Sequence, residues 1–158
     1  MKILFNEHPN KGFQRVGYCS YYGEIFYALE EVCEVTSSCG VPSRTSEFGS
    51  GYDAIVMGFG HTDCGDAGPM PTINDNNIPL FPILNKEYTG LKQKLEWIKN
   101  MKPTAALTVH HDTEEYSKIT GVPFHRIMWS ANENLFKDYG EDYKLSLIHI
   151  SEPTRRST

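Results

Sequence analysis

Histidines and carboxylates recur at the ends of short apolar segments in this chain of 158 residues. His61 and Asp63 follow the apolar run at 54–57, and His110 and Asp112 close another buried-strand pattern. Histidine exchanges a proton close to neutral pH, and a histidine beside a carboxylate is a common arrangement for general-base catalysis. We therefore expect the catalytic side chains among these four residues, with either histidine able to act as the base.

Further polar side chains stand at comparable positions, after the predicted strands. In a parallel sheet the carboxyl ends of the strands meet at one edge, and ligands bind in the crevice beyond that edge. The sequence therefore predicts that these residues line the same crevice: His8, Asn85, Lys86, Glu87 and His111.

Each of these residues also has an interpretation without function. Asp112 can cap a helix while His111 stays solvated, and His61 can hydrogen-bond within its own loop. Glu87 would stand in the first turn of a helix, where the helix dipole favours an acid, and Lys86 would be solvated. These readings stay open at this point.

Alternating strand and helix patterns predict how the residues are positioned. The strand patterns are short continuous apolar runs, which are typical of strands buried on both faces. We predict an α/β fold with a Rossmann-like, doubly wound and mainly parallel sheet. The predicted strands cover residues 2–5, 33–38, 54–57, 78–84 and 104–111, with an extended segment at 122–129.

Three helices are expected between these strands. The first starts at an N-cap on Ser20 and carries an apolar stripe, the second lies within 85–101, and the third runs from Asp112 or Thr113 to a C-cap at Gly121. The intervening segments at 6–20, 40–51 and 61–77 are expected to be loops. The stripe of the first helix consists of Tyr22, Ile25, Phe26, Leu29 and Val32, and that of the second of Leu91, Leu95 and Ile98.

Composition and motifs exclude several classes of function. The net charge is −5 and no Lys/Arg block occurs, which argues against a nucleic-acid surface. No apolar run reaches the length of a membrane span, and no signal peptide is recognisable, so we expect a cytoplasmic protein. The glycines of GFGHTDCG lack the GxGxxG spacing, and a P-loop is absent. The spacing of four cysteines (Cys19, Cys33, Cys39, Cys64) and of the histidines supports no metal site, so we expect neither metal nor cofactor.

A resemblance rests on the segments MKILF, YDAIVMGFG, NKEYTGLKQKLEWIK, TVHHD and VPFHRIMWSANENLFKDYG. Residues 1–144 resemble the N-terminal half of GT-B glycosyltransferases, of the family-one or spore-maturation-protein-like kind found in bacterial, phage and metagenomic sequences. The resemblance implies two Rossmann-like domains. The N-terminal domain recognises the acceptor and offers the catalytic base, and the C-terminal domain holds the nucleotide-sugar donor.

For this chain, the resemblance implies that His61 or His110 deprotonates an acceptor hydroxyl and that Asp63 or Asp112 orients the base. It also implies that the acceptor, a sugar, lipid or protein, lies against His8, Asn85, Lys86, Glu87 and His111. Two alternatives stay open. One is a stand-alone flavodoxin-like binding or regulatory module, for which NEHPNKGFQ is a poor phosphate loop, and the other is a His/Asp metal-dependent hydrolase.

The last fourteen residues, LSLIHISEPTRRST at 145–158, depart from this resemblance. The run LSLIHISEPTR matches the one-frame translation of a transposase adapter used in preparing sequencing libraries. We therefore expect 145–158 to be an artefactual, disordered tail that replaces the second domain. The chain would then be a truncated fragment, inactive by itself because the donor-binding domain is missing.

Overall fold

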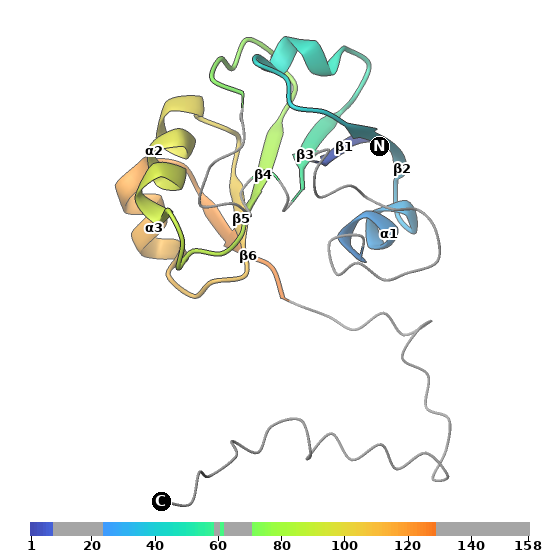
Figure 1. The fold of residues 1–158 in the computed structure, drawn as a ribbon. Coiled ribbons are helices and arrows are strands. Elements are labelled where there is room, and N and C mark those ends of the chain that lie inside the picture. The colour runs from blue at the N-terminus through green and yellow to red at the C-terminus, as the bar shows by residue number, and fades with distance from the viewer. Residues whose placement is uncertain (8–23, 59–60, 62–70, 129–158) are drawn as a thin grey trace, which may run out of the picture.

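The chain folds around a six-stranded, entirely parallel sheet, which confirms the predicted α/β class (Figure 1). The computed structural model describes residues 1–7, 24–58, 61 and 71–128. The strands lie in the order β2-β1-β3-β4-β5-β6. Their bounds are β1 Lys2–Glu7, β2 Glu34–Cys39, β3 Ala54–Met57, β4 Leu80–Leu84, β5 Ala106–Thr108 and β6 Phe124–Arg126.

Helices lie on both faces of the sheet. These are α1 (Glu24–Glu30), α2 (Leu91–Met101) and α3 (Thr113–Thr120), with a short 3₁₀ helix, η2 (Thr45–Phe48), between β2 and β3. In Figure 1, α2 and α3 lie side by side, and α1 lies apart from them near β1 and β2. None of the helices in the described ranges is long and apolar enough to cross a membrane.

The alternation of side chains along the strands produces the layers. Phe5 and Val56 point to one face, where they pack with Phe26 of α1. Leu4 and Ile55, one residue earlier on each strand, point to the other face and pack with Phe48 of η2. Successive side chains of a strand alternate between faces, so continuous apolar strands serve both layers at once. On the second face α2 and α3 cover the far strands through Leu84, Leu95, Ile98, Tyr116 and Phe124.

Three details of the sequence prediction are wrong. Strand β1 includes Asn6 and Glu7, which were predicted to be in a loop, because both pair with β2 and Asn6 also pairs with β3. Helix α1 ends at Glu30, so Val32 is outside the stripe and 77% exposed. Helix α2 begins only at Leu91, so Glu87 stands in a preceding turn and gains nothing from the helix dipole.

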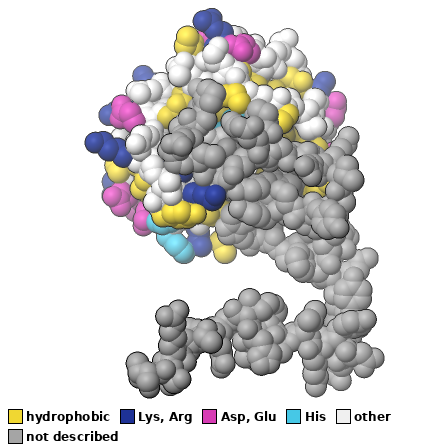
Figure 2. All heavy atoms as spheres, viewed as in Figure 1, with side chains coloured by type: hydrophobic (Ala, Val, Ile, Leu, Met, Phe, Trp, Pro, Cys, Tyr) yellow, Lys and Arg dark blue, Asp and Glu magenta, His cyan; other side chains and the backbone are white. Residues whose placement is uncertain are grey.

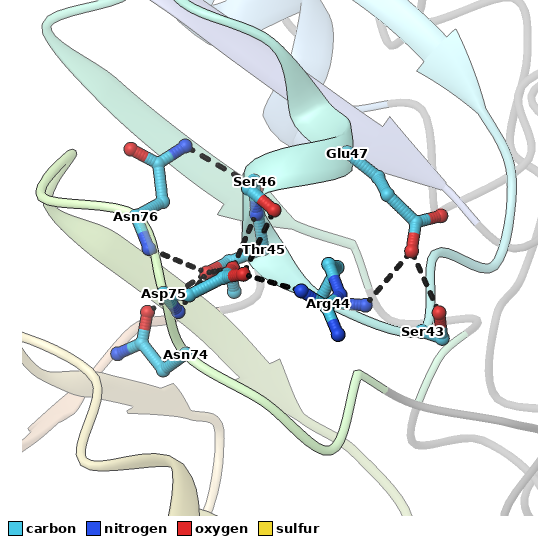
Figure 3. A network of polar contacts seen from close by, with 8 residues as sticks. All are labelled: Ser43, Arg44, Thr45, Ser46, Glu47, Asn74, Asp75 and Asn76. Carbon is cyan, nitrogen blue, oxygen red and sulfur yellow. Dashed lines mark hydrogen bonds and ion pairs between the residues drawn. The ribbon is translucent and has the colours of Figure 1, made fainter.

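The crossover from β2 to β3 contains η2 where a doubly wound fold usually has a longer helix. Figure 3 shows how it is held instead, by polar contacts with the segment before β4. The Asp75 carboxylate accepts from the Ser46 amide at 2.8 Å and its hydroxyl at 2.9 Å, and pairs with Arg44 at 3.2 Å. Thr45, 1% exposed, accepts through Oγ1 from the amides of Asp75 and Asn76, both at 3.0 Å. The predicted surface loop at 40–51 is therefore anchored in the fold.

Candidate active site

Glu87 and Thr108 meet at the carboxyl edge of the sheet, where β4 and β5 end. The pairing of Leu84 with Thr108 places the turn after β4 next to the last residue of β5. The Thr108 hydroxyl donates a hydrogen bond to the Glu87 carboxylate. Both side chains are buried: Thr108 is 0% exposed and Glu87 is 8% exposed. A carboxylate this deeply buried needs such donors, because burial without them is costly.

Lys94 of α2 fixes the turn that contains Glu87. Its buried Nζ donates to the carbonyl oxygen of Asn85 at 2.6 Å and to that of Lys86 at 2.9 Å. Lys86 has a positive φ of 50°, which turns the chain sharply after β4. The turn therefore receives its support from a buried ammonium group. Asn85 and Lys86, both predicted to contact a substrate, contribute their carbonyl groups to this frame.

His110 forms a dyad with Asp112 just beyond β5. The Asp112 Oδ2 atom lies 3.1 Å from His110 Nδ1, and the Tyr116 hydroxyl lies 3.1 Å from the same nitrogen. The His110 amide donates to Thr108 Oγ1 at 3.1 Å, and its ring stacks on Tyr116 with centroids 5.8 Å apart. Although Asp112 precedes α3, its side chain makes no capping hydrogen bond. The simple capping interpretation therefore does not describe this carboxylate.

Both a donor and an acceptor meet His110 Nδ1, because the Asp112 amide, whose nitrogen lies 3.4 Å away, can donate to the same atom that faces the Asp112 carboxylate. When Nδ1 carries the proton, Asp112 accepts from it and the lone pair of Nε2 is left for a substrate. Burial, followed by the negative charges of Glu87, Asp112 and Glu115, raises the pKa of Tyr116 to about 12. Tyr116 thus stays protonated at neutral pH. The side chains of the dyad are 42% and 52% exposed, so a substrate can reach the ring.

Basic and imidazole groups continue this edge toward β6. Arg126 Nη2 lies 3.4 Å from His111 Nε2, and both residues are exposed. The rings of His110 and His111 lie 6.4 Å apart. In Figure 2, histidine side chains come to the surface beside basic ones at the lower left of the molecule. The predicted substrate residue His111 therefore lies next to the dyad, with a guanidinium group at its side.

His61, the histidine of the second predicted pair, is not brought to this cluster. His61 follows β3, two strand positions from β5, which corresponds to about 10 Å across the sheet. It is 1% exposed, and its amide donates to the carbonyl oxygen of Gly58 at 3.3 Å. His61 therefore lies just beyond the carboxyl end of β3. Asp63 and His8, which we predicted to be catalytic and substrate-binding, lie outside the described residues.

Four contributors to the site were missed by sequence reasoning. Thr108 looked like one more residue of a buried strand, and Lys94 like part of a solvated helix face. Tyr116 stands four residues after Asp112, the spacing that places two side chains on one face of a helix. Its position next to the dyad could therefore have been predicted from the sequence. Arg126 stands at the end of the sixth strand and could have been found by the same strand-end rule.

Comparisons of the chain with protein-family profiles, with curated proteins and with solved structures give no significant match. Within the described ranges, no group of three or more His, Cys, Asp or Glu side chains is placed to hold a metal ion.

Proposed function

We propose that residues 1–144 form the acceptor-side domain of a sugar-transferring enzyme that uses a nucleotide-sugar donor. His110 is the general base that removes the proton from an acceptor hydroxyl, and Asp112 orients its ring. The observation that carries the proposal is the His110–Asp112 contact of 3.1 Å on a half-exposed ring at the carboxyl edge. This edge is the usual ligand site of an open parallel sheet.

The surroundings of the dyad support a role in proton transfer. Asp112 can stabilise the positive charge that His110 acquires, and the neutral hydroxyl of Tyr116 adds a second contact at the same nitrogen. Tyr88, which is 84% exposed after the turn of Glu87, offers an aromatic surface beside this edge. His111 and Arg126 extend it with groups that can donate hydrogen bonds to acceptor oxygens.

By the resemblance, a second domain would hold the nucleotide sugar, so sugar transfer is proposed for the natural full-length protein. The experiment therefore uses the natural gene, recovered with its own continuation after Lys144. Release of nucleoside diphosphate is measured with a panel of nucleotide sugars and acceptors.

In that enzyme, His110→Ala should lower kcat by about 10²–10⁴-fold, the usual contribution of a general base. Asp112→Asn should lower it by less, since Nε2 remains in place. His125→Ala is the matched control, because His125 is exposed on β6 and no contact joins it to the dyad among the described residues. Turnover at the wild-type rate in both dyad variants, with circular dichroism unchanged, would disprove the assignment.

One observation favours a second candidate, a flavodoxin-like binding module. The first five strands follow the order β2-β1-β3-β4-β5, which is the order of flavodoxin-like folds. The strand order reverses between β1 and β3, where Glu7 and His61 are buried. A flavin titration followed by fluorescence quenching separates the two candidates. Saturable binding by the present chain would favour the module over the transferase.

A further inference from the structure

A second site lies on the sheet face that η2 covers, over β1 and β2. It is a pocket of about 360 Å³, at the small end of the range for small-molecule sites. The pocket exists because the only helix of the β2–β3 crossover is η2, which has four residues and leaves part of this face uncovered. It is separate from the dyad, because β1 lies three strand positions from β5, which corresponds to about 14 Å.

One wall of the pocket is polar and belongs to the strands. Thr36 and Ser38 of β2 lie opposite Leu4 and Asn6 of β1, so all four share one face of the sheet. Asn6 is 3% exposed, and its Nδ2 donates to Ser38 Oγ at 2.8 Å. Its Oδ1 is buried and accepts no hydrogen bond from the described residues. A buried amide oxygen without a hydrogen bond is unusual, and since this atom is closed to solvent, the amide must shift before a ligand in the pocket can bond to it.

The Asn6–Ser38 pair can present either kind of hydrogen-bonding group. The Ser38 hydroxyl accepts from Asn6 Nδ2, but a hydroxyl can equally donate. If the Asn6 amide rotated, its Oδ1 would accept from the Ser38 hydroxyl, and its Nδ2 would be left to donate to a ligand. This pair therefore suits a ligand whose own groups both donate and accept, as hydroxyl groups do.

The opposite wall is apolar and comes from the crossover. Phe48 and Tyr52 line it. Lys2 Nζ lies 5.6 Å from the centroid of the Tyr52 ring but does not line the pocket. A ligand that is polar along its edge and apolar on its face would match both walls.

The charge of the pocket selects against anions. Its described lining contains no Lys, Arg or His, and it contains the Glu47 carboxylate. The Ser43 hydroxyl, which donates to that carboxylate at 2.6 Å, lowers the pKa of Glu47, so the group stays ionised. Partial desolvation, followed by the charge of Glu7, raises the pKa of Cys39, so its thiol stays neutral. A phosphate or carboxylate would meet the Glu47 carboxylate with no basic side chain among the described lining residues.

We propose that this pocket binds a neutral polyhydroxylated molecule of the size of one sugar ring. Its hydroxyl groups bond to Asn6, Thr36 and Ser38, and its apolar face packs against Phe48 and Tyr52. The assignment depends only on the described lining of the pocket. It holds whether or not the dyad transfers sugar.

Saturation-transfer NMR on the present chain tests the assignment with three probes. These are a neutral hexose, a ribonucleoside and the phosphate of the same hexose. Saturation of the hexose is expected, and binding of the nucleoside without the hexose would contradict the proposed ligand size. The hexose phosphate should bind at least tenfold more weakly. Equal binding of the phosphate, or no binding of either neutral probe, would overturn the proposal.

Variants locate the binding. Ser38→Leu fills the pocket and should abolish saturation, whereas Ser37→Leu should leave it unchanged, because Ser37 is exposed and alternates to the other face. Tyr52→Ala removes one of the two aromatic side chains of the apolar wall without touching the Asn6–Ser38 bond, and it should weaken binding about tenfold. This variant tests the site if Ser38→Leu does not fold. Unchanged binding in folded Ser38→Leu or in Tyr52→Ala would place the ligand elsewhere.

Discussion

Replacing Thr108 by Val tests the polar connection on which the candidate site is built. Val keeps the volume of the buried side chain and removes only the hydroxyl. That hydroxyl donates to the Glu87 carboxylate and accepts from the His110 amide. The substitution thus leaves a buried charge and a backbone donor each short of one partner.

The magnitude follows from these two bonds. A hydrogen bond to a charged group contributes about 1.5–3 kcal/mol, and a neutral one about 1 kcal/mol. Thr108 is fully buried and Glu87 nearly so, so water cannot replace the lost partner. We expect Thr108→Val to lower the free energy of unfolding by about 2.5–4 kcal/mol. This is a large share of the roughly 5–15 kcal/mol that a typical domain possesses.

Urea denaturation followed by circular dichroism measures this loss, and two further variants locate its cause. Thr108→Ser keeps the hydroxyl and should cost only about 1 kcal/mol, for one buried methyl group. In a double-mutant cycle with Glu87→Leu, the coupling energy between the two positions should be about 1.5–3 kcal/mol. Equal stabilities of Thr108→Val and Thr108→Ser, or a coupling energy near zero, would refute the reasoning.

Three further predictions concern Tyr116, Asp75 and Gly58. Because the pKa of Tyr116 is raised to about 12 in the folded state, its neutral hydroxyl stabilises the fold fully below pH 10. This contribution to the free energy of unfolding disappears as the pH rises from 10 to about 12. Tyr116→Phe should therefore flatten that part of the alkaline denaturation curve. The Ser46 amide, then its hydroxyl and Arg44, lower the pKa of Asp75, so the melting-temperature difference between wild type and Asp75→Asn should be largest at neutral pH and shrink below about pH 4. A Cβ on Gly58 would overlap the buried Glu7 carboxylate, so Gly58→Ala should cost about 1–3 kcal/mol in urea unfolding. The first prediction would be contradicted by parallel alkaline denaturation curves of wild type and Tyr116→Phe, and the second by a melting-temperature difference for Asp75→Asn that does not change with pH. The third would be contradicted by an unchanged free energy of unfolding in Gly58→Ala.

The fold class was predictable because the strands are continuous apolar runs. Segments such as Ala54–Met57 are buried at every position, and this happens only when both faces of a sheet are covered. The ends of the elements were less predictable. Asn6 and Glu7 look like loop residues by composition, but the neighbours β2 and β3 extend the ladder across them. Tertiary pairing outweighs local preference there.

The dyad was predictable in part, since His110 and Asp112 are near neighbours after a strand. Its support was not, because Glu87 and Thr108 are 21 residues apart and meet only through the register of β4 and β5. The role of Glu87 was misread because the chain does not enter α2 directly. Lys86 and Gly90 both have positive φ values, and they form a turn that places Glu87 under the sheet edge.

The geometry of His110 depends on how α3 is fixed. Asp112 stands at the start of this helix and Tyr116 one turn later, so a shift of the helix would change both contacts of His110 Nδ1 together. Ser117 fixes the helix to the sheet, since its Oγ accepts from the Phe124 amide of β6 at 2.9 Å and donates to the carbonyl oxygen of Thr113 at 2.7 Å. A general base must be held by side chains that are themselves immobilised. The sixth strand therefore contributes to the proposed chemistry by holding the helix that orients the base.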